Sequence, residues 1–330
     1  MKKRVLFISN MYPSKQKPYS GIFVKSHVDY FTKYYSDIFS TSKYVMQRKF
    51  TGKWGSVFKY LMFWIGFLKH LFIKYDIIHI HYIFPNVFLG YLYKIFHPES
   101  KLYVTLHGRD ITVQYPKYQL IFKYFAKKID TLIPVGETLK SLSEKYFSTV
   151  NKMVLPVGVD NLKFKQLKEG TIKYDFIFVG SFIHRKGLDY FINSLKSINK
   201  YKFKILFIGS GALKKDILLI DNHEINIFEN LSQDEINKYL NLSKWFVLPS
   251  RNEGFPTVTI ESFYTGTPVL GSDILQIQEQ IDDSVNGFIF EVENNESLTK
   301  VLLKAYEIAD VEYEKMSERA LNSFRDISLS

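Results

Sequence analysis

The chain has 330 residues, of which 46% are hydrophobic and 17% aromatic, so it has enough apolar material for two cores and is not a disordered sequence. It contains no cysteine, which excludes disulfide bonds and thiolate metal sites. Its net charge of +11 is uneven, because residues 1–160 carry 24 Lys and Arg against 9 Asp and Glu, whereas residues 161–330 carry 20 against 24. A basic first half predicts an anionic partner, either nucleic acid or a membrane surface. Its cations are mostly lysines, which favours the membrane over base readout and predicts no nucleic-acid partner.

The N-terminus predicts a buried strand rather than an export signal. Its apolar run Val5–Ile8 ends at Ser9, which is shorter than the roughly 7–15 apolar residues of a signal peptide. No stretch reaches about 18 apolar residues without a charge, so no membrane-spanning helix is predicted. These features predict a cytoplasmic protein.

Short apolar runs recur along the chain with room for a helix between them. Because they are continuous rather than alternating, they indicate parallel strands that are covered on both faces. The strand–helix alternation predicts an α/β fold with one doubly wound, Rossmann-like domain in each half, residues 1–158 and 159–312, and a C-terminal helix at 313–330. The predicted strands are Val5–Ile8, Ile77–Ile80, Leu102–Leu106, Thr131–Val135 and Met153–Val157, then Asp175–Val179, Lys204–Ile208, Ile225–Phe228, Trp245–Leu248 and Pro268–Leu270.

The stretch Trp54–Lys74 predicts a helix with two apolar faces. One stripe at helical spacing is sufficient for packing on the sheet, so the other face is predicted to lie on an anionic membrane surface. The alternative, in which both faces are buried within the domain, stays open. The packing stripe is Val57, Phe58, Leu61, Ile65, Leu68 and Phe72, and the membrane face carries Lys59, Tyr60, Phe63, Trp64, Phe67, Lys69, His70, Ile73 and Lys74.

A second helix is predicted directly after the strand Trp245–Leu248 and a short loop. Pro256 suits its first turn, since the N–H that proline lacks would have no helical partner there. The helix is predicted to run to about Tyr264. Its free N–H groups and its dipole would favour a diphosphate at the N-terminus.

Two glutamates flank this predicted helix start. Glu261 lies four residues after Thr257 and so on the same helix face, where it could accept hydrogen bonds from the hydroxyls of a ribose. Glu253 precedes the helix and could do the same for a hexose. Taken singly, Glu261 is better explained as a solvated helix residue and Glu253 as a helix cap, but their joint placement around the helix start favours a binding role.

The spacing of these glutamates resembles the Glu-x7-Glu motif of retaining GT-B glycosyltransferases, in particular the "group 1" enzymes of family 4. Glu253 and Glu261 stand at this spacing with Gly254-Phe255-Pro256-Thr257 after the first of them. In that family the first glutamate contacts the donor sugar and the second contacts the ribose of the nucleotide. The resemblance therefore implies that residues 253–257 and Glu261 bind the donor.

Residues 178–187 resemble the family's strand–loop–helix segment that carries a basic pair. Here the pair is Arg185 and Lys186, and Ser181 lies in the same loop on the donor side. Two cations at this point would neutralise the diphosphate and stabilise the charge that develops on it as the glycosidic bond breaks. A metal ion would then be unnecessary, and no cofactor is expected.

Three residues of the first half match the family in the same way. Gly21 corresponds to a loop glycine whose backbone approaches the donor phosphate. His107 and Asp110, in a His-Gly-x-Asp segment, correspond to a histidine beside the transferred sugar and to an acidic residue on the acceptor side. His79 and His81 alternate with apolar residues on a strand and are interpreted as structural.

The resemblance implies a GT-B fold, with two Rossmann-like domains facing across a cleft and a last helix that could cross back to the first domain. It also implies transfer of a sugar with retention from a nucleotide diphosphate sugar to a lipid-linked saccharide, in bacterial surface polysaccharide synthesis at the cytoplasmic face of the inner membrane. The alternative is a catalytically silent GT-B module that binds a nucleotide or a lipid. A hydrolase with paired carboxylates and a nucleic-acid binder are weaker alternatives.

Overall fold

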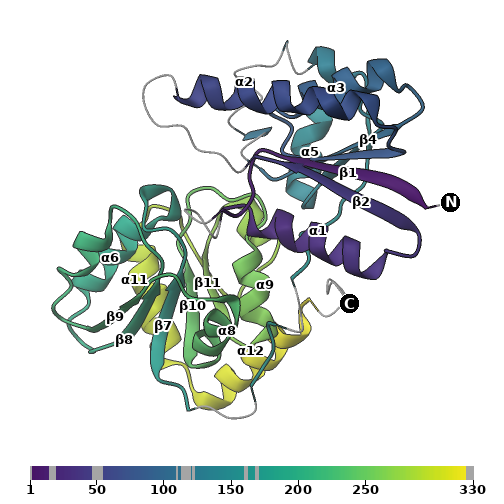
Figure 1. The fold of residues 1–330 in the computed structure, drawn as a ribbon. Coiled ribbons are helices and arrows are strands. Elements are labelled where there is room, and N and C mark those ends of the chain that lie inside the picture. The colour runs from purple at the N-terminus through teal and green to yellow at the C-terminus, as the bar shows by residue number, and fades with distance from the viewer. Residues whose placement is uncertain are drawn as a thin grey trace. The chain divides into compact units, whose positions relative to one another are not determined.

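The computed structural model describes residues 2–14, 20–46, 55–108, 111–112, 120, 123–159, 163–167 and 171–324, apart from the side chain of residue 56. The chain divides into two compact units, Met1–Val157 and Gly158–Ser330, and each is described by itself (Figure 1). Each unit contains a six-stranded parallel sheet. The prediction of a doubly wound α/β fold in each half is therefore confirmed.

The first sheet has the strand order β2-β1-β3-β4-β5-β6. Helices cover both of its faces, because successive residues of the central strands point to opposite sides. The strands are β1 (Lys3–Ser9), β2 (Phe39–Val45), β3 (Ile77–His81), β4 (Lys101–Leu106), β5 (Thr131–Pro134) and β6 (Asn151–Lys152), and the helices are α1 (Ile22–Tyr34), α2 (Gly55–Phe67), η1 (Leu68–Phe72), α3 (Val87–Phe96) and α5 (Glu137–Tyr146).

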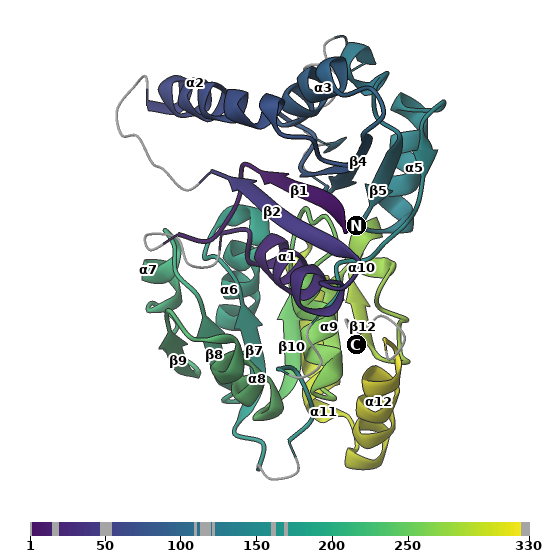
Figure 2. The ribbon, with the colours of Figure 1, turned by 45° about the vertical axis from the view of Figure 1, so that its right-hand side comes forward.

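Strand β1 shows how the two layers of helices are built. Val5 and Phe7 pack with residues of α1, whereas Leu6 and Ile8 pack with residues of α2 and α3 on the opposite face. Figures 1 and 2 show α1 on one side of this sheet and α2 and α3 on the other. All four side chains are at most 1% exposed, as expected for a strand that is covered on both faces.

Helix α2 buries the face that was expected to be outside, so the prediction for Trp54–Lys74 is wrong in its orientation. Phe63 and Phe67 are 6% and 0% exposed, and Trp64 packs against the core. The ring of Tyr44 stacks on Phe63 at 4.7 Å, and its hydroxyl donates to the Phe63 carbonyl at 2.5 Å. A side chain at position 66 would meet that hydroxyl at 2.6 Å, so Gly66 lets Tyr44 approach on this face. Trp54 lies outside the described residues.

The outer side of α2 and η1 is the stripe that was expected to pack on the sheet. Its residues are 45–90% exposed, so this stripe lies at the surface of the protein. Lys69 and Lys74 are also exposed, whereas Lys59 is half-buried. None of the described helices has the length and apolarity needed to span a bilayer. The exposed stripe is Val57, Phe58, Leu61, Ile65, Leu68 and Phe72.

The second sheet has the order β12-β11-β10-β7-β8-β9, in which chain order reverses between β7 and β10. Helices again cover both faces (Figure 2). The strands are β7 (Tyr174–Val179), β8 (Lys204–Ile208), β9 (Glu224–Phe228), β10 (Ser243–Leu248), β11 (Val269–Ser272) and β12 (Gly287–Phe290), and the helices are η3 (His184–Lys186), α6 (Leu188–Ser197), α7 (Lys214–Ile217), α8 (Gln233–Asn241), α9 (Thr257–Tyr264), α10 (Leu275–Gln278), α11 (Asn295–Glu307) and α12 (Asp310–Asn322).

Helix α12 packs within the second unit. Its Met316 joins the core on the α6 and α11 face of the sheet, and Ala320 joins the core on the α8 and α9 face. The ring of Phe324 stacks on Phe263 of α9 at 5.7 Å. Residues 325–330, where the predicted C-terminal helix would continue, lie outside the described residues, so the crossing helix stays a prediction.

The strand predictions failed at edges and at short strands. β2 was missed because it is an edge strand with four consecutive polar residues at 40–43, and β12, which was also missed, is a four-residue strand at the edge of the second sheet. Met153–Val157 is not a strand, because the regular ladder with β5 includes only Asn151 and Lys152. Two further hydrogen bonds, from Met153 and Leu155 to β5 carbonyls, continue along the same edge.

Candidate active site

The candidate site lies where the strand order of the second sheet reverses. β7 and β10 are hydrogen-bonded neighbours, although two strands separate them in the chain. In doubly wound sheets, ligands bind beyond the carboxyl ends of the strands at such a point. The loop after β7 carries Arg185 and Lys186, and the loop after β10 carries Glu253. The topology therefore brings the predicted basic pair next to the first predicted glutamate.

Lys186 and Glu253 form the central ion pair of this site. The Lys186 ammonium donates to Glu253 Oε1 at 2.5 Å, and the Ser250 hydroxyl donates to the same oxygen at 2.6 Å. Glu253 is only 7% exposed, so its charge is held by these donors rather than by water. Arg185 lies further away, with Nη1 3.9 Å from Glu253 Oε2 and donating at 3.0 Å to the carbonyl of Asn252.

A glycine lets the two loops approach this closely. Gly187 has a φ of 69°, in the left-handed region, and a Cβ there would meet the Pro249 carbonyl oxygen at 1.6 Å. No other residue fits at that distance without moving one of the loops. The Arg251 N–H also donates to the Arg185 carbonyl at 3.0 Å and ties the loops together.

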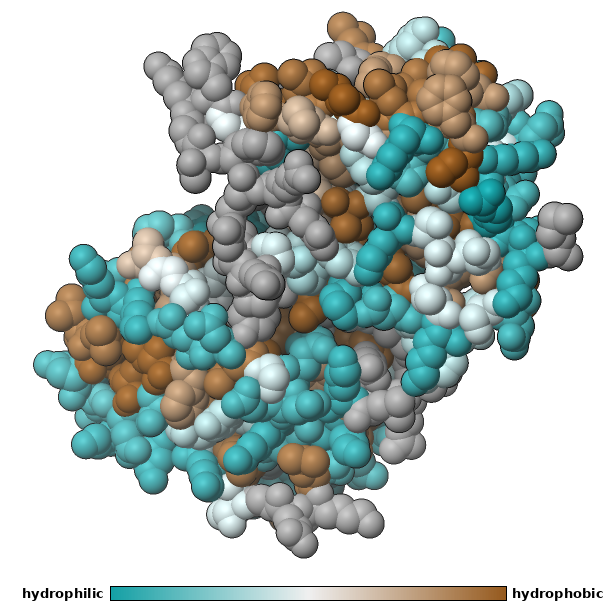
Figure 3. Space-filling model, viewed as in Figure 1, coloured by the Kyte–Doolittle hydropathy of each residue, from teal (hydrophilic) through white to brown (hydrophobic). Residues whose placement is uncertain are grey.

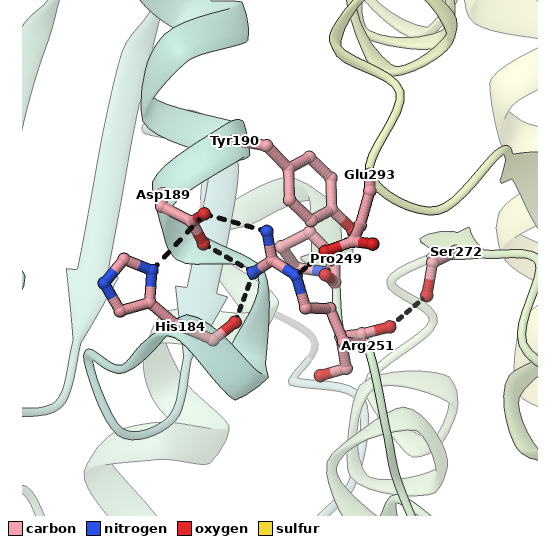
Figure 4. A network of polar contacts seen from close by, with 8 residues as sticks. His184, Asp189, Tyr190, Pro249, Arg251, Ser272 and Glu293 are labelled. Carbon is pink, nitrogen blue, oxygen red and sulfur yellow. Dashed lines mark hydrogen bonds and ion pairs between the residues drawn. The ribbon is translucent and has the colours of Figure 1, made fainter.

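Arg251 is the residue that reasoning from the sequence missed. Its guanidinium donates through two nitrogens to the two carboxylate oxygens of Asp189, at 2.6 Å and 2.8 Å. It also donates to Glu293 and to the His184 carbonyl, and it lies over the ring of Tyr190 at 5.0 Å (Figure 4). Burial alone would raise the pKa of Asp189, but the hydrogen bonds from Arg251 outweigh it and lower that pKa.

This network holds the loop of Arg185 and Lys186 in position through the helix that follows it. Asp189 lies in the first turn of α6, directly after η3, so Arg251 connects the loop after β10 to the helix that follows the basic pair. A bidentate arginine–carboxylate pair has a defined geometry, which a single lysine contact lacks. The signal in the sequence was an arginine two residues before Glu253, but nothing there indicates Asp189 as its partner.

Helix α9 begins at Thr257, one residue later than expected. Pro256 is the N-cap residue in an extended conformation, not the first helical residue. Gly254, Phe255 and Thr257 are half-buried and Pro256 is buried, so this helix start is largely packed. Ser181, the predicted donor residue of the loop after β7, is exposed. Donor binding by these residues stays a prediction.

Glu261 lies on the second turn of α9. Desolvation by burial raises the pKa of its carboxyl from 4.5 to about 7. Among the residues that the structure describes, no hydrogen bond or ion pair reaches this carboxyl. Glu261 is half-buried, and a carboxyl without a protein partner is available to accept hydroxyl hydrogen bonds from a ligand.

Two of the predicted residues of the first unit, Gly21 and His107, lie in loops that follow strands β1 and β4. Gly21 has a φ of 70°, and a Cβ there would meet the Met11 carbonyl oxygen at 2.6 Å, so packing within the unit already requires glycine at this position. His107 follows β4, and its Nε2 lies 3.1 Å from His81 Nδ1. Asp110 lies outside the described residues.

His107 belongs to a cluster of four histidines. His79, His81 and His27 pack ring against ring, with the centroids of His79 and His81 4.7 Å apart, and His79 Nε2 lies 2.7 Å from the Thr105 hydroxyl oxygen. Burial lowers the pKa of His107 to about 3 and that of His27 to about 4. The described residues contain no group of three or more histidines and carboxylates arranged to hold a metal ion.

The family model for glycosyl transferases group 1 matches residues 159–323, which is the second unit with the ion pair, the Arg251 network and Glu261. The chain belongs to this family. The resemblance that was based on the two glutamates and the basic pair is thus confirmed.

Individual relatives cover more of the chain. The uncharacterized glycosyltransferase MJ1178 of Methanocaldococcus jannaschii is 30% identical over 69% of this chain and 65% of that protein. The glycosyltransferase TuaC of Bacillus subtilis (strain 168) is 29% identical over 60% of this chain and 53% of that protein. An alpha-1,3-galactosyltransferase of Escherichia coli is 27% identical over 70% and 66%. The chain thus spans about half to two thirds of the length of these relatives.

Solved structures of glycosyltransferases share the fold. Sucrose-phosphate synthase from Thermosynechococcus elongatus superposes with a TM-score of 0.79 at 13% identity, over 99% of this chain and 95% of that chain. Anabaena Alr3699/HepE, solved in complex with UDP, gives a TM-score of 0.76 at 14% identity over 100% and 96%. The prediction of the GT-B fold is confirmed.

Proposed function

We propose that this protein transfers a sugar from a nucleotide diphosphate sugar to a saccharide acceptor. The observation that carries the proposal is the cluster of Arg185, Lys186 and Glu253 at the switch point of the second sheet. Two cations beside one buried carboxylate suit a ligand with a diphosphate next to a sugar. The relative HepE was solved with UDP and with UDP-glucose, which supports a nucleotide-sugar donor.

The cations supply the chemistry in this proposal. As the bond between the anomeric carbon and the diphosphate breaks, negative charge grows on the leaving phosphate. Arg185 and Lys186 stabilise that charge, and this lowers the barrier without a metal ion. Glu253 accepts hydroxyl hydrogen bonds from the sugar and so fixes the position of its anomeric carbon. Glu261 accepts those of the nucleotide ribose.

Retention is part of the same proposal, and its support is the resemblance to the retaining enzymes of the family. With no side chain assigned as a protein nucleophile, retention requires that the acceptor hydroxyl attacks from the face that the diphosphate leaves. The departing phosphate oxygen takes the proton of that hydroxyl. In this proposal, the sequence-based roles of His107 beside the transferred sugar and of Asp110 on the acceptor side stay predictions.

The acceptor is proposed to be a lipid-linked saccharide in bacterial surface polysaccharide synthesis. The name of the Escherichia coli relative states a diphosphoundecaprenol-linked acceptor, and that of TuaC states teichuronic acid biosynthesis. Such an acceptor lies in a membrane, so the protein is proposed to work at the cytoplasmic face of the inner membrane as a peripheral enzyme.

The experiment is a screen of the full chain with UDP-, GDP-, ADP- and dTDP-sugars. Thermal shift identifies the donor that binds, and release of the nucleotide diphosphate is then measured with and without an undecaprenyl-diphosphate-linked saccharide. Acceptor-dependent release and a product with a retained anomeric configuration are expected. Binding of a nucleotide without any transfer would identify a silent module. If calorimetry detects no binding of any nucleotide diphosphate, the proposal fails.

A further inference from the structure

The exposed stripe on α2 and η1 is a continuous apolar surface on the first unit. Its six residues follow helical spacing, and Phe72 at the end is 90% exposed. Figure 3 shows hydrophobic residues gathered over α2 and α3 on this side of the molecule. Soluble proteins rarely expose a contiguous apolar patch of this kind unless it contacts a partner.

The inner face of α2 packs against neighbours that also expose apolar residues. Trp64 of α2 contacts Phe88 of α3 with ring centroids 5.2 Å apart, and Phe88 contacts Phe125 at 5.5 Å. Tyr91 of α3 donates to the hydroxyl of Tyr124 at 3.2 Å. α2, α3 and the helical segment 123–126 therefore lie side by side. Ile95 and Phe96 of α3 are 55% and 60% exposed, and Tyr124 is 55% exposed.

The charges on these elements are all of one sign. Residues 55–72, 87–96 and 120–128 contain lysines but no aspartate or glutamate. Lys69 and Lys74 are exposed at the η1 end of the stripe, and Lys123, Lys127 and Lys128 are exposed on the third segment. An apolar surface rimmed only by cations is complementary to a layer that is apolar inside and anionic outside.

We infer that this face of the first unit docks on an anionic lipid bilayer, with Leu61, Ile65 and Phe72 inserted among the acyl chains and Lys69 and Lys74 at the headgroups. The inference rests on the proposed function only in that a lipid-linked acceptor would lie in such a bilayer. It uses the face of α2 opposite to the one that the sequence indicated.

The charge distribution favours a bilayer over a second copy of this chain. A symmetric dimer would bring the same patch of both copies together. Lys69 and Lys74 would then meet lysines of the partner, with no carboxylate on these segments to pair with them. A bilayer containing phosphatidylglycerol supplies the missing anions.

The first test measures sedimentation of the full chain with vesicles of phosphatidylglycerol and phosphatidylethanolamine, and with phosphatidylcholine alone. Binding to the anionic vesicles is expected, and Leu61→Asp/Ile65→Asp should weaken it at least tenfold. Lys69→Gln/Lys74→Gln should weaken it by roughly fivefold per lysine. The control is Leu218→Asp/Leu219→Asp, an exposed apolar pair of the second unit that should bind as the unchanged protein does.

The second test does not depend on how well these variants fold. Because the chain has no cysteine, Ile65→Cys and the control Leu218→Cys each provide one site for an environment-sensitive fluorophore. The label at position 65 should shift to the blue with anionic vesicles and be quenched by nitroxide lipids, whereas the label at 218 should not. An equal response at both positions, or none at 65, overturns the inference. A shift at 65 that depends on protein concentration without vesicles overturns it in favour of a dimer.

These outcomes are separable from those of the proposed function. Vesicle binding is measured without any nucleotide, and the substituted positions belong to the first unit, whereas the donor residues belong to the second. A protein that binds vesicles but no nucleotide sugar would refute the function and keep the docking surface. A protein that transfers sugar to a water-soluble acceptor but does not bind vesicles would refute the docking surface and keep the function.

Discussion

Lys186 and Glu253 form a hydrogen-bonded ion pair of 2.5 Å across 67 positions of the chain. Lys186 is largely buried and Glu253 almost wholly so, which means that each charge is compensated mainly by the other. Removing one member of such a pair leaves the other buried without a partner. The two predicted donor residues therefore act as a unit, and their substitutions are expected to be strongly non-additive.

The first prediction concerns Lys186. Lys186→Gln should lower kcat by about 10²–10³, because a preorganised donor to the leaving phosphate is lost. Initial rates at saturating donor and acceptor measure this. Lys215→Gln, at an exposed lysine of the same unit, should leave kcat unchanged. The same kcat in the Lys186 variant and the unchanged protein would remove the proposed leaving-group role.

The double variant Lys186→Gln/Glu253→Gln tests the coupling. If the two residues act as a unit, its kcat should be no lower than that of the worse single variant. If the losses of kcat in the two single variants multiply in the double variant, the residues act independently. That result would contradict the ion pair as the functional arrangement.

The second prediction concerns Arg251, which positions the basic loop. Arg251→Lys keeps the charge but loses the two-pronged contact with Asp189, so kcat/KM should fall by roughly 10–100-fold. Asp189→Asn should cause a similar loss, and the two substitutions together should cost little more than either. Glu293→Gln removes one contact at an exposed residue and should have a small effect. A loss of thermal stability with unchanged kcat/KM would contradict the positioning role.

The third prediction concerns Glu261, whose pKa of about 7 lies above its ordinary value of 4.5. Without ligand, the protein should lose stability as pH rises from about 4.5 through 7, because the half-buried carboxyl then ionises. Affinity for the nucleotide diphosphate should move the other way, rising up to about tenfold between pH 6 and 8, since the carboxylate is the better hydroxyl acceptor.

Calorimetry at pH 6 and 8 measures this change in affinity. The ionisation of the diphosphate itself is common to all variants, so Glu261→Gln provides the control. This variant should bind more weakly at pH 8, with a smaller dependence on pH. An identical pH dependence in both proteins would show that Glu261 does not contact the ligand.

The fourth prediction concerns the histidine cluster. Since burial lowers the pKa of His27 to about 4 in the folded state, stability should be lost as pH falls below about 6.5, where the unfolded chain takes up a proton. For His27 alone, the free energy of unfolding should be about 1–2 kcal/mol lower at pH 5 than at neutral pH. His79, His81 and His107, whose pKa values are also lowered, should add to it.

Thermal melts followed by circular dichroism at pH 7.5 and 5.0 test the histidine cluster. His27→Gln should reduce the difference between the two melting temperatures, whereas His184→Gln, at an exposed histidine of the second unit, should not. Equal differences in all three proteins would show that the cluster does not govern acid sensitivity.

Local signals in the sequence were enough for most strands and for the family. Continuous apolar runs indicated nine of the strands, because burial on both faces leaves a local mark that no tertiary contact needs to supply. The glutamate spacing and the basic pair are likewise short segments, and they identified the family before any contact between them was known. Strand β2, with four consecutive polar residues, left no such mark.

The sequence by itself determined that Trp54–Lys74 is apolar on two sides, but only the tertiary structure decided which side is inside. Both faces carry enough large apolar side chains to pack on the sheet, and the face that is buried is the one where the ring of Tyr44 stacks on Phe63 beside Gly66. The contacts of Glu253 were decided in the same way. Lys186 and Arg251 could be read as cations from the sequence, but their carboxylate partners come from strand order, which brings β7 beside β10.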